Sequence, residues 1–297
     1  MMFWKSMIYR WDKETLKQWP SLKKSAYILL PLLLYFCIHD AAELLLWAGM
    51  DYVVRSGNEQ VVAFVSNHTD TLRGIINGAV ILIGTAVIWP AIGNELRGAG
   101  NPVYKQDYKG RKNSDVTVAA TKYGMLLGIS FGLAVGLNLM LTQIGFVQSS
   151  ESFEVVHKQQ YGVQFVIGLI LYGVISPFAE EAVFRGLLYN RMKRCFPVGI
   201  AIVLSALLFG CYHGNIVQAV YGTILGIVIA YLYEIIGGFE VPVLFHSMAN
   251  VSVYAIGYQK RMSELSPSVA WIMAIVALVV AAVLLWHIRR EYKFTDS

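Results

Sequence analysis

Long apolar segments recur along this 297-residue chain, and short polar stretches separate them. A helix needs about 20 mainly apolar residues to cross the ~30 Å hydrocarbon layer of a bilayer. That length predicts eight crossing helices, at residues 25–49, 73–93, 122–145, 161–189, 197–214, 216–236, 240–257 and 268–288. The pattern therefore predicts an all-α fold, a polytopic membrane helix bundle of about eight transmembrane helices. The turns between 210 and 240 are short and glycine-rich, so a re-entrant segment is the alternative there.

Composition supports a membrane protein. The chain is 56% hydrophobic and 14% charged, and its mean hydropathy is +0.54, well above the usual range of soluble domains. Its three cysteines, Cys37, Cys195 and Cys211, are widely spaced, which favours neither a disulfide framework nor a zinc ribbon.

Basic residues predict the orientation of the bundle. The net charge of +5 comes from short clusters between apolar segments: the N-terminus, "YKQDYKGRKN" at 104–113, "RMKR" at 191–194 and "RREYK" at 289–293. Such clusters mark cytoplasmic loops, and eight crossings place all four, with both termini, in the cytoplasm. The clusters therefore indicate topology and exclude a nucleic acid as partner.

Residues 1–24 are too long and too charged for the start of a cleaved signal peptide. Trp4, Trp11 and Trp19 alternate there with lysines and arginines. Aromatic and basic residues in this arrangement predict an amphipathic segment that lies in the membrane interface.

An unusual charge cluster lies in the fourth predicted span, "SPFAEEAVFRGLLYNR" at 176–191. Each ionisable group within a bilayer costs several kcal/mol, so each needs a reason. Glu181 and Arg185 are four residues apart on one helix face, where the guanidinium can neutralise the carboxylate. Glu180 lies about 100° further around the helix and is free to face a cavity.

Two later spans carry further polar groups. His213 follows Phe209 by four residues in "FGCYH", and Asn250 follows His246 by four residues in "HSMAN". A carboxylate beside an imidazole can activate a water molecule, and a second histidine with an asparagine can stabilise the oxyanion of amide hydrolysis. Glu180, His213 and His246 are equally ordinary ligands for a catalytic zinc. Sequence alone does not separate these two mechanisms.

Each group alone also has a structural explanation. An ion pair can bridge two helices, a lone histidine is commonly a hydrogen-bonded core residue, and a His–Asn pair can join helices. What favours chemistry is the occurrence of all three groups on separate helices that short turns make neighbours.

Other polar and small residues are weaker candidates for a catalytic role. His39, Asp40 and Glu43 in the first span either line a substrate entrance or pair with one another near a helix end. Gly222 and Gly226 have the small-xxx-small spacing that favours close helix packing.

These motifs resemble those of a known family. "EEAVFR" fits EExxxR, "FGCYH" fits FxxxH and "HSMAN" fits HxxxN, in that order on successive spans. The chain thus resembles the CPBP (CAAX-processing and bacteriocin-processing, or Abi) intramembrane endopeptidases. The resemblance is centred on residues 161–257. It divides the chain into residues 1–24, N-terminal transmembrane helices at 25–145, and a catalytic core with the C-terminal helix at 146–297.

The resemblance also implies roles for individual residues. Glu180 and His213 would activate the water, His246 and Asn250 would form the oxyanion pocket, and Glu181 with Arg185 would support the site. The family is commonly labelled as metalloproteases, yet its glutamate and histidine have also been interpreted as acting without a metal. We favour Glu180 as the base and leave open a divalent metal such as zinc, held by Glu180, His213 and His246.

The sequence therefore predicts an intramembrane endopeptidase in a bacterial cell membrane. Its expected partners are the lipid bilayer and a peptide or membrane-protein substrate, such as a bacteriocin or signalling-peptide precursor, cut near the cytoplasmic face. The alternatives are a non-catalytic relative that acts in bacteriocin immunity or as a scaffold, and, last, a proton-coupled transporter. Symmetric broken helices, which are typical of transporters, are missing from the sequence pattern.

The predicted topology raises one difficulty. Counted at about 1.5 Å per residue, Glu180 and His246 lie nearer the basic side than His213 does. Convergence requires staggered or shortened helices, and Pro177 predicts a kink just before Glu180.

Overall fold

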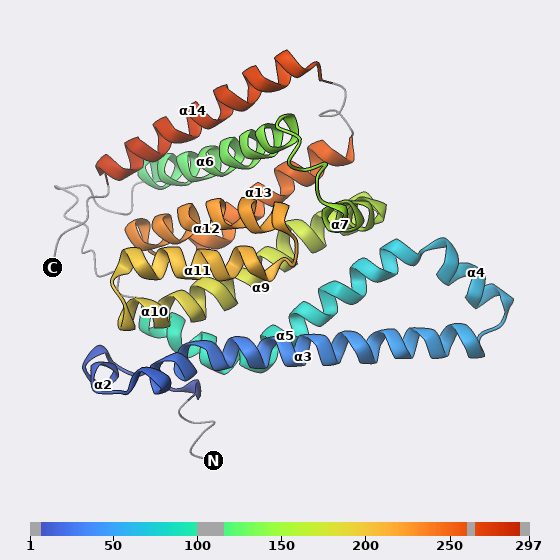
Figure 1. Ribbon diagram of the computed structural model, residues 1–297, viewed down its shortest axis with the longest axis horizontal. Coiled ribbons are helices and arrows are strands. Elements are labelled where there is room, and N and C mark those ends of the chain that lie inside the picture. Colours follow the sequence, from blue (N-terminus) through green and yellow to red (C-terminus); the bar gives the residue numbers. More distant parts are fainter. Residues whose placement is uncertain (1–6, 100–115, 260–264, 292–297) are drawn as a thin grey trace.

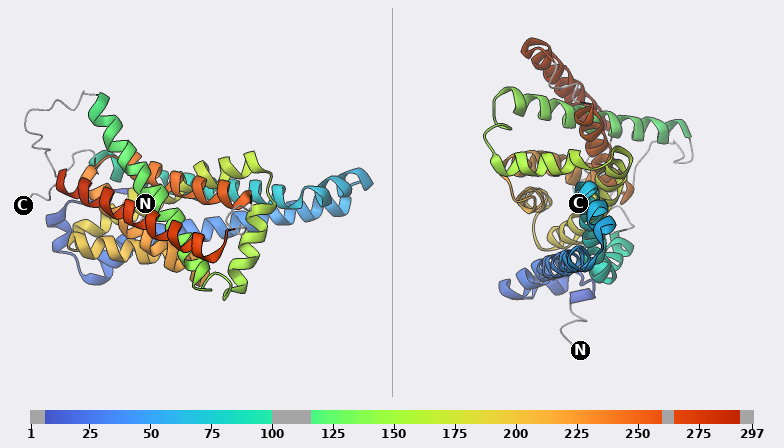
Figure 2. Two further views of the ribbon diagram at one scale, coloured as in Figure 1. Left: turned by 90° about the horizontal axis from the view of Figure 1, so that it is seen from above. Right: turned by 90° about the vertical axis from the view of Figure 1, so that its right-hand side faces the viewer.

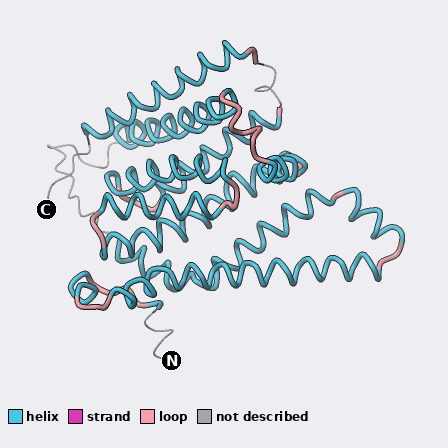
Figure 3. Tube along the Cα trace, in the orientation of Figure 1, coloured by secondary structure: helices cyan, strands magenta, loops and turns pink. Residues whose placement is uncertain are grey.

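The computed structural model describes residues 7–99, 116–259 and 265–291, and these residues are almost entirely helical. No strand occurs among them, and only short loops join the helices (Figure 3). This arrangement confirms the all-α fold class. The helices are α2 (Lys13–Lys17), α3 (Ser21–Ser56), α4 (Glu59–Asn67), α5 (Thr69–Ala99), α6 (Val116–Gln143), α7 (Glu151–Gly162), α8 (Phe165–Ile170), α9 (Ser176–Glu181), α10 (Asn190–Cys195), α11 (Val198–Tyr212), α12 (Ile216–Ile236), α13 (Glu240–Tyr258) and α14 (Pro267–Glu291), with π-helical segments η1 (Leu171–Ile175) and η2 (Ala182–Tyr189).

Each of the eight predicted spans corresponds to a helix or a continuous helical run. Six described segments are long and apolar enough to cross a membrane: Ser21–Ser56, Thr69–Gly98, Ala119–Gln143, Phe165–Cys195, Ile216–Ile236 and Pro267–Glu291. The fourth of these is the run from α8 to α10. The two remaining predicted spans correspond to α11, which has only 15 residues, and to α13, which is more polar.

The helices form layers. Helix α14 packs on α6 at one face of the molecule, and the hairpin of α3 and α5 lies at the opposite face (Figures 1 and 2). Between them, α6 packs on α13, α13 packs on η1 and α9, and α11 packs on α12. The run that carries Glu180 is therefore enclosed by α5, α11 and α13.

Successive long segments run in opposite directions across the bundle. The start of α3 and the end of α14 lie at the same end, together with the α10–α11 turn (Figure 1). This agrees with an even number of crossings, while the cytoplasmic location of that end remains a prediction.

The α3–α4–α5 segment forms an arm that projects beyond the other helices (Figure 1). Helix α3 alone has 36 residues, about 54 Å at 1.5 Å per residue. That length exceeds the ~30 Å hydrocarbon layer even with strong tilt. Part of the arm therefore extends past the apolar layer.

The N-terminal segment is more compact than one long amphipathic helix. Between residues 9 and 20 the chain forms the five-residue α2, whose N-cap Asp12 accepts a hydrogen bond from the Thr15 N–H at 2.8 Å. Leu16 is fully buried, and the Trp11 and Trp19 rings lie 5.2 Å apart. The segment thus folds onto the bundle, and its interfacial role remains a prediction.

Candidate active site

Two π-helical segments frame the glutamate pair. Pro177 lacks the N–H that would bond to the carbonyl of Gly173, so the helix widens into η1 just before α9. A second widening, η2, begins immediately after Glu181. Such widenings change the rotation between successive side chains and are common at functional sites.

Glu181 is the centre of a buried charge network. Its Oε1 accepts hydrogen bonds from Arg185 Nη1 at 3.0 Å and from His246 Nδ1 at 2.8 Å. Arg185 also donates through Nη2 to the carbonyl of Gly226 at 3.0 Å. The Glu181 and Arg185 side chains are fully buried. This confirms the i,i+4 pairing expected from sequence and adds His246 as a third member.

Glu180 takes different partners. Its Oε1 accepts a hydrogen bond from the Ser176 hydroxyl, whereas its Oε2 is buried without a hydrogen-bond partner. That free oxygen lies 4.0 Å from His213 Nε2 and 3.8 Å from His246 Nε2. These distances are too long for direct hydrogen bonds. Glu180 is therefore the carboxylate that faces both histidines.

The histidine tautomers follow from the partners on Nδ1. His213 Nδ1 lies 3.0 Å from the carbonyl of Phe209, which can only accept, so this nitrogen carries the proton. His246 Nδ1 faces a carboxylate that Arg185 also binds, and the same assignment follows. In its neutral form each ring thus directs the Nε2 lone pair toward Glu180 Oε2. Three acceptor atoms face one another.

Phe209 supports the rings of the site. Its centroid lies 5.1 Å from the His213 ring and 5.4 Å from the His246 ring, both nearly perpendicular to it. The guanidinium carbon of Arg185 lies 4.5 Å from the same centroid. An aromatic ring suits this position because its face attracts the cation and both imidazoles pack edge to face.

Asn250 is held by the widened helix. Its Nδ2 donates to the carbonyl of Tyr172 at 2.9 Å, and Tyr172 belongs to η1. An amide nitrogen carries two hydrogens, so one donor remains after this bond. Asn250 therefore joins α13 to η1 one turn beyond His246.

The short α11 resolves the difference in depth expected from sequence. Its 15 residues span about 22 Å, and the chain turns back at Gly214, which has φ +72°. A positive φ favours glycine, and the side chain of Asn215 then caps α12 by accepting from the Gln218 N–H at 2.9 Å. His213, at the C-cap of α11, thus ends level with Glu180 inside the bundle.

Close helix packing brings α12 to the network, as the small-xxx-small spacing predicts. A Cβ on Gly226 would lie 3.0 Å from Arg185 Nη2 and 3.1 Å from Ala206 Cβ. A Cβ on Gly222 would lie 3.4 Å from the Gly210 Cα. Position 226 therefore requires glycine, because a side chain would crowd Arg185 where the Gly226 carbonyl accepts its hydrogen bond.

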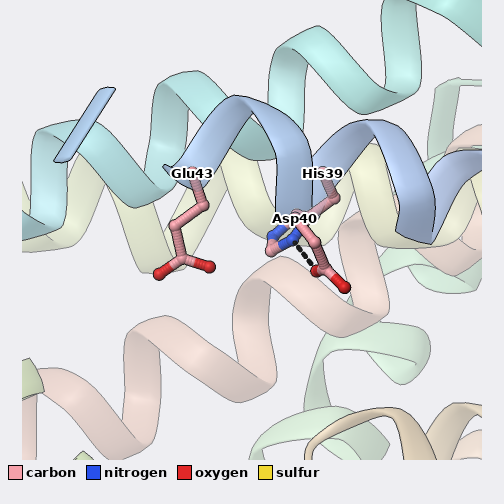
Figure 4. Close-up of side chains that lie close together, drawn as sticks. All are labelled: His39, Asp40 and Glu43. Atoms are coloured by element: carbon pink, nitrogen blue, oxygen red, sulfur yellow. Dashed lines mark hydrogen bonds and ion pairs between the residues drawn. The ribbon is translucent and has the colours of Figure 1, made fainter. Parts of the chain in front are cut away.

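His39, Asp40 and Glu43 project from neighbouring turns of α3, outside this network (Figure 4). His39 Nδ1 lies 3.1 Å from Asp40 Oδ1, and the Asp40 side chain is 76% exposed. One turn earlier, the Tyr35 hydroxyl lies 3.4 Å from that of Tyr212, the residue before His213. His39 and Asp40 thus pair, as one sequence interpretation expected, and the Tyr35–Tyr212 contact puts this stretch of α3 on the side of the site where α11 ends.

The donor set at Glu180 is more open than a closed zinc site. Around one zinc, the donors of a tetrahedral set lie about 3.3–3.5 Å apart, whereas Glu180 Oε2 is 3.8 and 4.0 Å from the two histidine nitrogens. In the described part of the chain, the group whose three ligand atoms all lie within 4.8 Å of one another is His39, Asp40 and Glu43. As arranged, Glu180, His213 and His246 do not fit a metal ion held by all three.

Sequence reasoning missed several supporting residues. Ser176 precedes Glu180 by four residues, so helical spacing alone marks it as a partner. The buried group of Glu95 and Arg191, which meet at 3.0 Å, gives no such signal because 96 residues separate its members.

Comparison with known proteins supports the family resemblance. Residues 162–252 match the family model described as Type II CAAX prenyl endopeptidase Rce1-like. This range contains Glu180, His213, His246 and Asn250. The segment is thus similar to CAAX prenyl endopeptidases, as the three motifs predict.

A curated relative points the same way. Over 124 residues the chain is 25% identical to the Bacillus subtilis (strain 168) protein named "Putative membrane peptidase YdiL". The match covers 42% of this chain and 49% of the relative, so the chain spans about half the length of the curated relative it matches. A search of solved structures gave no match.

Proposed function

We propose that this chain is an intramembrane endopeptidase in which Glu180 activates a water molecule. The observation that carries the proposal is the buried, unpartnered Oε2 of Glu180, which lies about 4 Å from Nε2 of both His213 and His246. The similarity of residues 162–252 to CAAX prenyl endopeptidases supports it. Hydrogen-bond acceptors at these separations suit a small molecule that can donate to two of them at once. A water molecule has two O–H groups and meets this requirement.

In the proposed reaction, water donates one hydrogen to Glu180 Oε2 and the other to His213 Nε2. Its oxygen attacks the carbonyl carbon of the scissile peptide bond, and Glu180 takes the proton. The proton then passes to the leaving nitrogen as the C–N bond breaks, which regenerates the carboxylate. General-base catalysis of this kind contributes about 10²–10⁴-fold to a rate.

His246 and Asn250 serve the oxyanion in this proposal. A protonated His246 would carry a hydrogen on both ring nitrogens. Glu181 is placed to hold that imidazolium through Nδ1. Nε2–H then becomes a donor, and the remaining hydrogen of Asn250 Nδ2 supplies a second one.

No step of this mechanism passes through a metal ion. The donor separations favour a hydrogen-bonded water over a three-ligand ion, as described above. The proposal therefore assigns water activation to protein groups alone.

The proposed substrate is a peptide or membrane-protein segment that reaches the site from within the bilayer. Glu180 lies at the middle of the helical run Phe165–Cys195, so the scissile bond must enter the bundle. We place the protein in a bacterial cell membrane with both termini in the cytoplasm, because the sequence pattern puts the basic clusters on one side of the predicted crossings. A small peptide precursor is the substrate class that suits this setting.

The test is cleavage of a library of membrane-inserting peptides by the purified full-length protein in proteoliposomes. Variants Glu180→Ala, His213→Ala and His246→Ala are compared with wild type at equal amounts of folded protein. We expect cleavage by wild type and a loss of at least about 100-fold in the Glu180 and His213 variants. Full activity in either variant would contradict this mechanism. A cellular phenotype that persists in Glu180→Gln would instead favour a scaffold or immunity role.

A further inference from the structure

We propose that the end of the bundle formed by α10, the N-terminal segment and the start of α3 binds the phosphate of an anionic lipid headgroup, through Arg10, Lys24 and Arg194. This inference concerns a site distant from Glu180. It does not depend on the proposed peptidase activity.

A buried carboxylate organises this end of the bundle. Glu95, fully buried near the end of α5, accepts hydrogen bonds through Oε1 from Tyr27 at 2.9 Å, Arg191 at 3.0 Å and Arg194 at 2.8 Å. Its Oε2 lies 2.7 Å from Arg194 Nη1 and 3.6 Å from Arg10 Nε. Three guanidiniums therefore surround one carboxylate.

The positive charge exceeds what the fold supplies to balance it. The C-terminal end of α5 adds about half a negative charge to that of Glu95, which leaves more than one positive charge without a counter-charge. The nearby acidic residues of the N-terminal segment are already committed, because Asp12 caps α2 and Glu14 pairs with Lys17 at 2.8 Å. An anion from outside the protein is the natural complement.

Hydrogen-bond donors are left over at the same place. The Arg194 side chain is only 10% exposed and its terminal nitrogens already contact Glu95 and Tyr27, so it contributes mainly positive charge. The Arg10 side chain is 36% exposed, and within the described residues its terminal nitrogens have no assigned hydrogen bond. A planar guanidinium with free terminal N–H groups suits bidentate binding of phosphate.

Arg10 is held in position by the backbone it crosses. A Cβ on Gly98 would meet Nε, Cδ and Cζ of Arg10, so the guanidinium lies directly over this glycine near the end of α5. The Arg10 side chain is nevertheless 36% exposed. The donor group is thus arranged before any ligand arrives.

Lys24 adds a third cation at this end. It precedes Tyr27 by three residues on α3, where the Tyr27 hydroxyl accepts a hydrogen bond from Arg194 at 2.8 Å, and its own Nζ donates to the carbonyl of Lys17 at 3.3 Å. An ammonium carries three hydrogens, so further donors remain. Lys24 therefore lies where it can share an anion with Arg194.

The location favours a lipid as the source of the phosphate. The Trp11 and Trp19 rings lie 5.2 Å apart at a 60° tilt near the start of α3, and Lys23 Nζ lies 3.9 Å from the Trp19 ring centroid. Tryptophan with flanking lysine is typical of the headgroup level of a membrane. Basic pockets between helices at that level bind anionic headgroups.

The experiment uses the full-length protein in nanodiscs of phosphatidylcholine with and without phosphatidylglycerol, and native mass spectrometry counts the retained lipids. We expect wild type to retain phosphatidylglycerol selectively. The double variant Arg10→Gln/Lys24→Gln should weaken that retention about 25-fold, at roughly fivefold per basic residue. Lys158→Gln is the matched control, because this exposed lysine lies in α7 at the other end of the bundle and pairs with Glu154.

Unfolding midpoints in phosphatidylcholine alone establish that the variants are folded. Equal phosphatidylglycerol retention by wild type and the double variant would overturn the proposal. A competition arm adds inorganic phosphate: binding of free phosphate that depends on Arg10 and Lys24, without selective lipid retention, would identify a soluble anion as the ligand and also overturn it.

Discussion

Glu180 and Glu181 are adjacent in the chain, yet their carboxylates face different partners. Glu181 Oε1 binds Arg185 at 3.0 Å and His246 at 2.8 Å, whereas Glu180 Oε2 lies 3.8 and 4.0 Å from Nε2 of two histidines. Each carboxylate has one buried oxygen without a hydrogen bond, but the free oxygen of Glu180 is the one that faces both histidine rings, so Glu181 supports the site and Glu180 is available for chemistry.

Loss of Arg185 should destabilise the protein more than loss of the whole ion pair. Arg185→Met leaves Glu181 buried without its cation, which costs about 3–5 kcal/mol in the free energy of unfolding. Glu181→Gln/Arg185→Met removes both charges and should recover a large part of that loss. Unfolding midpoints of the two variants in one detergent measure the difference, and a double variant that is less stable than Arg185→Met would contradict the assignment.

Gly226→Ala should lower both stability and activity, because its Cβ meets Arg185 and Ala206. Overpacking of this kind costs about 1–3 kcal/mol. Gly124→Ala in α6 is the matched control, since nothing lies within 4 Å of its added Cβ. That control should leave stability unchanged or raise it by about 0.5–1 kcal/mol. Equal effects of the two substitutions on the thermal unfolding midpoint would argue against close packing at Gly226.

Arg191→Lys should loosen the N-terminal segment. Arg191 donates through three nitrogens, to Glu95 and to the carbonyls of Tyr27 and Met7, and a lysine cannot reproduce this fork. We expect faster trypsin cleavage after Arg10 and Lys13, measured by mass spectrometry. Arg97→Lys is the control, because exposed Arg97 binds only its helix neighbour Asn94 among the described residues. Unchanged cleavage in Arg191→Lys would show that the segment is held elsewhere.

Chelation should not abolish the proposed peptide cleavage. The donor atoms of Glu180, His213 and His246 are spaced for water more than for one zinc ion, so cleavage should persist in the presence of phenanthroline. Metal analysis of the active protein should give well under one zinc per chain. Inactivation that added zinc reverses, together with loss of zinc in His213→Ala, would contradict the metal-free mechanism.

The sequence was informative wherever partners lie on one helix face or in successive apolar segments. The eight segments, the Glu181–Arg185 pair and the close packing at Gly226 follow from helical spacing and hydropathy. The family resemblance also follows from three short motifs, and residues 162–252 support it.

What sequence reasoning could not supply depends on geometry between distant segments. Helices α4 and α7 lie in polar connections and have no long apolar run to mark them. The widening at η1 depends on how Pro177 is accommodated, and the bond from Asn250 to Tyr172 exists only because α13 packs there. Likewise, the hydrogen bond between Glu181 and His246 joins residues that are 65 positions apart in the sequence.

The most direct test compares Glu180→Gln with Glu181→Gln in the peptide-cleavage assay and in thermal unfolding. Glutamine at 180 keeps the shape of the side chain but removes the base, so cleavage should fall by at least about 100-fold while the unfolding midpoint stays near that of wild type. Glutamine at 181 leaves Arg185 buried without its carboxylate, so the midpoint itself should fall. Wild-type cleavage by folded Glu180→Gln would contradict the central claim that this carboxylate activates the water.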